Sequence, residues 1–210
     1  MKIKSVLLIA AAAVSMNLAA ENPNLMKGGD LEKGFVGWTD YTRGTWKSGV
    51  VKDAEAQNAY FHMELTNFRK NAKGTRTVGG DCYFGRTGKF VGVEIKPDTE
   101  YEVTFKAKST FPTGVSMQIL AWNELTPKPW HPSRKRIAVK KFAANDKEWT
   151  TCKMTFRTKP ENKSVAVCFY MWGDESQERN FRIQLGNYYV IDDIELREVA
   201  APAAAPAAAK

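Results

Sequence analysis

The chain has 210 residues, of which 43% are hydrophobic and 26% charged, and its formal net charge is +8. This length suits one β domain with its own core, and no long Gly, Ser or Pro tract in the middle marks a second domain. The charge favours anionic surfaces or acidic polymers in general, but the densest basic run, 134–136, carries no nucleic-acid-reading motif and is expected to be a solvated loop.

The first twenty residues have the layout of a secretory signal peptide. Lys2 and Lys4 precede an apolar run over 6–14, and small residues end at Ala20. The apolar run is far shorter than the roughly 20 residues that cross a bilayer, so no transmembrane segment is expected. The sequence therefore predicts cleavage near Ala20 and a secreted, periplasmic or cell-surface protein.

The body of the chain, 24–199, has the alternation of β-strands. Tyr101, Val103 and Phe105 alternate with polar residues, which puts one face of this strand in a core and the other in water. The same alternation recurs over 115–121, 152–156, 165–172 and 192–197. Turn signals lie at 96–99, 111–114, 145–147 and 159–162. No stretch keeps a helical period for three turns, so we expect an all-β, two-sheet antiparallel sandwich or a barrel.

Three cysteines, Cys82, Cys152 and Cys168, would meet an oxidising environment after export. One disulfide can form among them, leaving one thiol, and the sequence does not give the partners. With only two histidines in the chain, the spacing fits no zinc site.

Four segments carry a family resemblance: GGDLEKGFVGW from Gly28, VEIKPDTEYEVTFKAKS from Val93, EWTTCKMTFRT from Glu148 and YYVIDDIELREV from Tyr188. In this order they resemble jelly-roll carbohydrate-binding modules with the galactose-binding-like fold, especially families four, nine and twenty-two. The resemblance implies a β-sandwich over 24–199 with its two ends close together. Residues 200–210, AAPAAAPAAAK, lack large apolar side chains and are expected to form a disordered tail.

The resemblance also implies a structural calcium ion that ties the first strand region to the last. At the matching positions the carboxylate ligands are Glu32 and Asp192. Asp192 shares parity with Ile194 and Leu196, so we expect it to point inward, where an unpaired charge is costly. The alternative is that Asp192 only hydrogen-bonds the first strand.

A sugar-binding face needs aromatic rings outside the core, because Trp and Tyr faces stack on the C–H patches of pyranose rings. Trp122, Tyr170 and Trp172 are out of phase with their core-facing neighbours, and the family places the equivalent strands in a concave glycan-binding sheet. Gln118 shares the face of Trp122 and is expected to hydrogen-bond sugar hydroxyls. The alternative for each ring is packing under a loop.

Further candidates lie in loops and on other strands. Trp130, between prolines, is expected to form a groove wall, and Arg179 to bind a ring hydroxyl or a uronate. Tyr83 and His62 are weaker candidates on neighbouring strands. The other tryptophans are expected to pack at the domain ends or core margins: Trp38, Trp46 and Trp149.

These features together predict an exported, non-catalytic module that binds a polysaccharide. No motif marks a catalytic carboxylate pair, and no Gly-x-Ser-x-Gly is present. One alternative is a structural or interaction protein of the cell envelope, because the chain ends in an Ala-Pro tail that resembles a spacer to a surface or an enzyme complex. Another is a polysaccharide-degrading enzyme, since the fold does not exclude catalysis.

Overall fold

The computed structural model describes residues 22–32, 38–41, 44–55, 57–85, 92–128, 130–174 and 183–200. The predicted signal peptide, residues 201–210 of the predicted tail, and Arg179 lie outside these residues. The described residues form strands, turns and loops without a helix, as the sequence predicted. In this part of the chain no helix has the length and apolar character needed to span a membrane.

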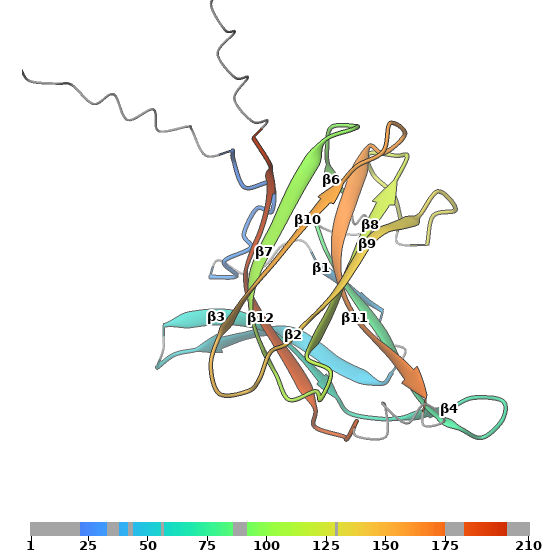
Figure 1. The fold of residues 1–210 in the computed structure, drawn as a ribbon. Coiled ribbons are helices and arrows are strands. Elements are labelled where there is room, and N and C mark those ends of the chain that lie inside the picture. The colour runs from blue at the N-terminus through green and yellow to red at the C-terminus, as the bar shows by residue number, and fades with distance from the viewer. Residues whose placement is uncertain are drawn as a thin grey trace, which may run out of the picture.

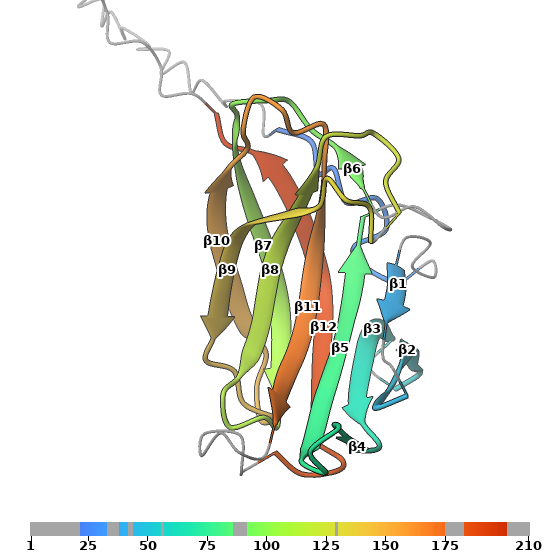
Figure 2. The same ribbon diagram turned by 90° about the vertical axis from the view of Figure 1, so that its right-hand side faces the viewer.

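The strands form two antiparallel sheets that pack face to face (Figures 1 and 2). The first sheet has the order β1-β5-β11-β8-β9, with β4 beside β5 and β6 beside β11: β1 (Trp38–Tyr41), β4 (Arg69–Lys70), β5 (Arg76–Phe84), β6 (Val93–Glu94), β8 (Val115–Trp122), β9 (Lys135–Phe142) and β11 (Ser164–Asp174). The second sheet has the order β10-β7-β12-β3-β2: β2 (Trp46–Asp53), β3 (Asn58–Leu65), β7 (Glu100–Ser109), β10 (Thr150–Arg157) and β12 (Tyr188–Glu198). The predicted two-sheet β-sandwich is therefore confirmed.

Alternating side chains of both sheets fill the space between the layers. On β7 the buried positions include Val103 and Phe105, which lie opposite Met154 and Cys152 of β10. A chain of aromatic contacts crosses the core from Phe61 to Phe84, Phe169 and Phe105, with ring centroids 4.9, 5.4 and 4.9 Å apart. Edge-to-face pairs of this kind add to the stabilisation from burial, so these rings join the two sheets.

The two ends of the domain lie side by side, as the resemblance implied. The Leu25 N–H donates to the Leu196 carbonyl, and the Ile194 N–H donates to the Gly29 carbonyl. A Cβ at Gly29 would lie only 1.9 Å from the Ile194 oxygen, so glycine is required for this close approach. Residues 22–32 therefore pack along β12.

The three cysteines are buried and none forms a disulfide. Cys82 lies on the core side of β5, where its Sγ is 3.2 Å from Sδ of Met63. Cys168 faces away from the core, because it lies opposite Tyr83, the residue next to Cys82 in the same strand. The two thiols thus lie on opposite faces of one sheet, and the disulfide that the sequence allowed is absent.

Candidate functional site

The outer face of the first sheet gathers most of the predicted sugar-binding residues. Cross-strand partners share a face, and Tyr170 and Trp172 of β11 lie opposite Asp81 and Gly79 of β5. On the other side of β11, Cys168 lies opposite Gln118 of β8. Phe169, one residue along, is in the core, so the prediction that Tyr170 and Trp172 face away from the core is confirmed.

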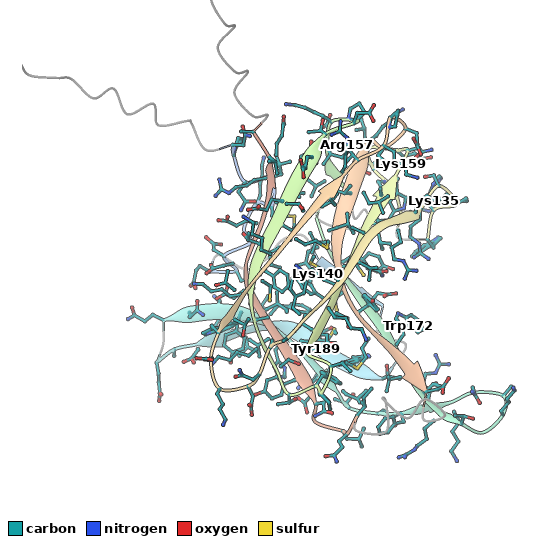
Figure 3. All side chains as sticks on the ribbon, in the orientation of Figure 1. Lys135, Lys140, Arg157, Lys159, Trp172 and Tyr189 are labelled. Carbon is teal, nitrogen blue, oxygen red and sulfur yellow. The ribbon has the colours of Figure 1, made fainter. Side chains whose placement is uncertain are left out.

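Trp172 is held against the sheet and is nevertheless 45% exposed. A Cβ at Gly79 would lie 2.6 Å from Cζ3 of the indole, so the ring occupies the space that a side chain at position 79 would need. The indole Nε1 donates to Oδ1 of Asp81 at 3.1 Å. Figure 3 shows Trp172 at the outer side of β11, with Tyr189 of the core nearer the middle of the molecule. A fixed and exposed indole is a suitable stacking platform for a sugar ring.

Hydrogen bonds connect Trp172 to the basic segment before β9. The Tyr83 hydroxyl donates to Oδ2 of Asp81 at 3.4 Å and accepts from Nη1 of Arg134 at 3.2 Å. Burial raises the pKa of Asp81, while its hydrogen bonds and the nearby Arg134 oppose that increase. Burial also raises the pKa of Tyr83, so its phenol stays protonated. Asp81 accepts from both the Trp172 indole and the Tyr83 hydroxyl, and it therefore holds the indole in position.

The prediction that Trp122 stacks on a sugar is wrong, because its side chain is fully buried. It faces away from the core, as predicted, but belongs to a second cluster with Tyr83, Leu120, Ala166 and Cys168. The β8–β9 loop folds back beside it: Pro127 of this loop is buried, and the Ser164 hydroxyl, opposite Trp122, donates to the Glu124 carbonyl. A ring with no exposed surface cannot stack on a sugar.

Gln118 is also buried, so the expectation that it meets sugar hydroxyls is wrong for this conformation. Its side chain is 9% exposed, and Nε2 lies 3.4 Å from Sγ of Cys168, to which it donates. Tyr170 is partly buried and packs against the second cluster. Beside Trp172, the described face therefore offers Tyr170 as a second, partly exposed ring.

Trp130 is 63% exposed, in a loop that the His131–Glu124 contact of 3.0 Å closes. The loop follows the end of β8 at Trp122, which lies opposite Ser164 at the start of β11. Eight residues of extended strand, about 26 Å, separate Ser164 from Trp172. The β8–β9 loop, which carries Trp130, and the C-terminal end of β11, which carries Trp172, lie at opposite ends of the sheet (Figure 2). The two rings therefore do not form one groove.

Three residues that shape this face were not predicted from the sequence. Gly79 and Asp81 position Trp172. The exposed Arg136 of β9 lies opposite Leu120, and its charge opposes the increase that burial causes in the pKa of Tyr170. Glycine inside a strand indicates a close approach of another group, so the Gly79-Gly80 pair was an available signal. Nothing in the local sequence shows that Asp81 reaches Trp172.

Glu32 and Asp192, the predicted calcium ligands, both reach the start of β3. Oε1 of Glu32 accepts from the Ala59 N–H at 2.9 Å, and Oδ2 of Asp192 accepts from the Asn58 amide at 3.0 Å. Among the residues with described positions, no three His, Cys, Asp or Glu side chains gather into a metal cluster. Glu32 and Asp192 thus lie near the same strand end, and the calcium ion that the resemblance implies stays a prediction.

The inward orientation predicted for Asp192 is wrong, because β12 contains a β-bulge. Asp192 lies opposite Lys106 and Glu195 lies opposite Thr104, so β12 has one more residue than β7 between these pairs. Asp193 within the bulge has φ of 48°. The extra residue puts Asp192 on the face of Lys106, while Ile194 stays in the core. Asp192 as a residue is still only 4% exposed, and burial raises the pKa of its carboxyl group.

Comparisons with known proteins find similarity at the level of the fold. No family model matches the sequence, and no curated protein matches it. A family 61 carbohydrate-binding module in complex with β-1,4-galactotriose superposes with a TM-score of 0.50 and 15% identity, covering 84% of this chain and 99% of that one. A family 4 carbohydrate-binding module gives 0.51 and 13%, covering 83% and 99%.

An enzyme domain shares the same architecture in part. The enzymatically active domain of bacteriophage CBA120 tailspike protein 4 gives a TM-score of 0.50 and 10% identity, covering 84% of this chain but only 21% of that one. At these identities the likeness is one of fold. The chain is therefore a jelly-roll β-sandwich built like carbohydrate-binding modules, as its sequence predicted.

Proposed function

We propose that the protein is an exported, non-catalytic carbohydrate-binding module whose glycan stacks on Trp172. The observation that carries this proposal is an indole 45% exposed, pressed against Gly79 and anchored by Asp81 at 3.1 Å. A pre-positioned ring loses little conformational freedom when it binds, and its face suits the C–H patches of a pyranose. Tyr170 extends the apolar surface on the same strand.

The hydrogen bonds of Asp81 favour a binding role over catalysis. A glycosidase needs two carboxyl groups about 5 to 9.5 Å apart that act on the scissile bond. Asp81 is instead engaged by the indole of Trp172 and the hydroxyl of Tyr83. Its position supports a structural role beneath the sugar-binding ring.

Export and calcium complete the proposal. The lysines and apolar run of residues 1–20 support secretion. Glu32 and Asp192 would hold the ion where the N-terminal segment, β3 and β12 meet. The burial of Asp192 supports this, because burial raises the pKa of its carboxyl although Asn58 and Asp193 donate to it and Lys106 lies nearby. A bound cation would offset this cost of burying the charge.

Retention on insoluble polysaccharides tests the glycan site. The family 61 neighbour is bound to β-1,4-galactotriose, so β-1,4-galactan is the first polymer to try, followed by cellulose, xylan and mannan. We expect retention on at least one polymer, lost in Trp172→Ala and kept in Trp130→Ala, an equally drastic change at an exposed indole. Retention that survives Trp172→Ala would refute the site.

A structural or interaction protein of the cell envelope is the second candidate. It is favoured by the burial of Trp122, which removes one of the predicted stacking rings from the surface. A folded wild-type protein that no polysaccharide retains would support this function instead. Release of reducing ends from the same polymers would show an enzyme.

A further inference from the structure

An aromatic pocket lies on the outer face of the second sheet, opposite the face that carries Trp172. It has a volume of about 290 Å³, and its wall includes Tyr60, His62, Lys108, Asp146, Trp149 and Tyr188. Val190 of β12 lies opposite both His62 of β3 and Lys108 of β7, so three strands of the second sheet form its floor. Asp146 and Trp149, in the segment between β9 and β10, form one side.

The rings of this pocket meet at angles, which gives a ligand several surfaces to contact. Tyr60 and Trp149 have centroids 6.3 Å apart with planes at 65°, and His62 and Tyr188 are 5.4 Å apart at 36°. Trp149 is 36% exposed, so it is not only a core-margin residue as the sequence suggested. A corner of tilted rings lets one ring stack on a flat ligand while another contacts its edge.

The polar groups are of mixed sign and suit a ligand without charge. Lys108 is a donor, Asp53 and Asp146 are acceptors, and the phenols of Tyr60 and Tyr188 can do both. Burial lowers the pKa of His62, so near neutral pH its imidazole also donates and accepts. Such a set matches the hydroxyl groups of a sugar.

Two other ligand classes fit less well. A cationic ligand would compete with Lys108, whose Nζ already lies 5.3 Å from the centre of the Trp149 ring. An acidic ligand would meet the carboxylates of Asp53 and Asp146. The volume of about 290 Å³ lies just below the range of typical ligand pockets, roughly 300–1,000 Å³, so the pocket suits one ring better than a long chain.

We propose that this pocket binds one neutral pyranose ring, on the face of the sandwich opposite Trp172. The site is separate from the proposed glycan face, since Trp172 lies on the outer side of the first sheet and the pocket on the outer side of the second. A protein with a sugar site on each outer face can bridge two glycan chains, which raises its avidity without new contacts.

Nitrogen-15 NMR of the mature chain tests the proposal with named probes: galactose, glucose, mannose, xylose and glucuronate. We expect the Trp149 indole signal and amides of β3 and β12 to shift saturably with at least one of the neutral sugars. Trp149→Ala should weaken this binding at least about tenfold, and Trp149→Phe should restore part of it because it keeps a ring. Trp172→Ala should leave it unchanged.

The controls separate this inference from the proposed function. If Trp149→Ala unfolds the chain, Asp146→Ala at an exposed position serves instead, and we expect several-fold weaker binding. Pocket signals that respond to no neutral sugar, or to glucuronate alone, overturn the inference. Binding that disappears in Trp172→Ala and persists in Trp149→Ala also overturns it, while the proposed glycan face stands. Binding that needs Trp149 alone supports the pocket and leaves Trp172 to be judged by polysaccharide retention.

Discussion

Trp172 and Gly79 face each other across β11 and β5, and the indole occupies the volume above the glycine. A Cβ at position 79 would lie 2.6 Å from Cζ3 and 2.9 Å from Cε3 of the ring. The exposed ring is therefore positioned by the residue beneath it as well as by its hydrogen bond to Asp81. Each contact can be changed separately.

Gly79→Ala should displace the indole and weaken glycan binding. We expect about tenfold lower affinity, which corresponds to about 1.4 kcal/mol, and an overpacking loss of about 1–3 kcal/mol in the free energy of unfolding. Gly49→Ala is the matched control, because Gly49 lies in β2 and a methyl group added there would meet nothing within 4 Å. Affinity electrophoresis in galactan gels measures the effect; equal affinities for the two variants would contradict it.

Asp81→Asn should change how stability depends on pH. Burial raises the pKa of Asp81 above its unfolded value, so the folded state binds the proton more tightly. This contribution is fully present below the unfolded pKa and is lost as the pH rises through the folded pKa. The asparagine variant should lack that loss, so its stability relative to wild type should improve from acidic to neutral pH. Urea unfolding from pH 3.5 to pH 7 measures this, and parallel curves for both proteins would refute the prediction.

Trp122→Ala should destabilise the fold much more than Trp172→Ala. Trp122 is fully buried in the second cluster, and truncating a buried aromatic residue costs about 3–5 kcal/mol. Trp122→Phe should cost less, because it keeps a ring and removes an indole N–H that finds no hydrogen-bond partner among the residues whose positions are described. Chemical denaturation compares the three variants, and a loss below about 1 kcal/mol for Trp122→Ala would show that its cluster is not closely packed.

Calcium should raise the melting temperature of the protein. An ion that binds only the folded state stabilises it, and Glu32 and Asp192 join the N-terminal segment and β12 to β3 at the proposed site. We expect a chelator to lower the melting temperature of wild type and to have little effect on Asp192→Asn. Scanning calorimetry with calcium and with chelator makes the comparison. If neither calcium nor the chelator changes the melting temperature of wild type, the ion is removed from the proposal.

Strand positions followed from the sequence because side-chain alternation is a local property. The patterns over 101–107 and 152–156 predicted β7 and β10, and both strands alternate between buried and more exposed residues as expected. The same reasoning failed at Asp192, where a bulge adds one residue and reverses the face. The prediction that Tyr83 and His62 both lie on neighbouring strands is also wrong, because they lie on the outer faces of different sheets.

Local patterns in the sequence were enough for the fold class and for the outward orientation of Trp122, Tyr170 and Trp172, and the family resemblance implied that the two ends of the domain meet. They were not enough to tell which outward-facing ring reaches the solvent. Alternation fixes the side of a strand on which a residue lies, whereas exposure depends on chain far away in the sequence. In the folded protein the β8–β9 loop folds back beside Trp122, and Gly79 leaves room for Trp172 to lie on the surface.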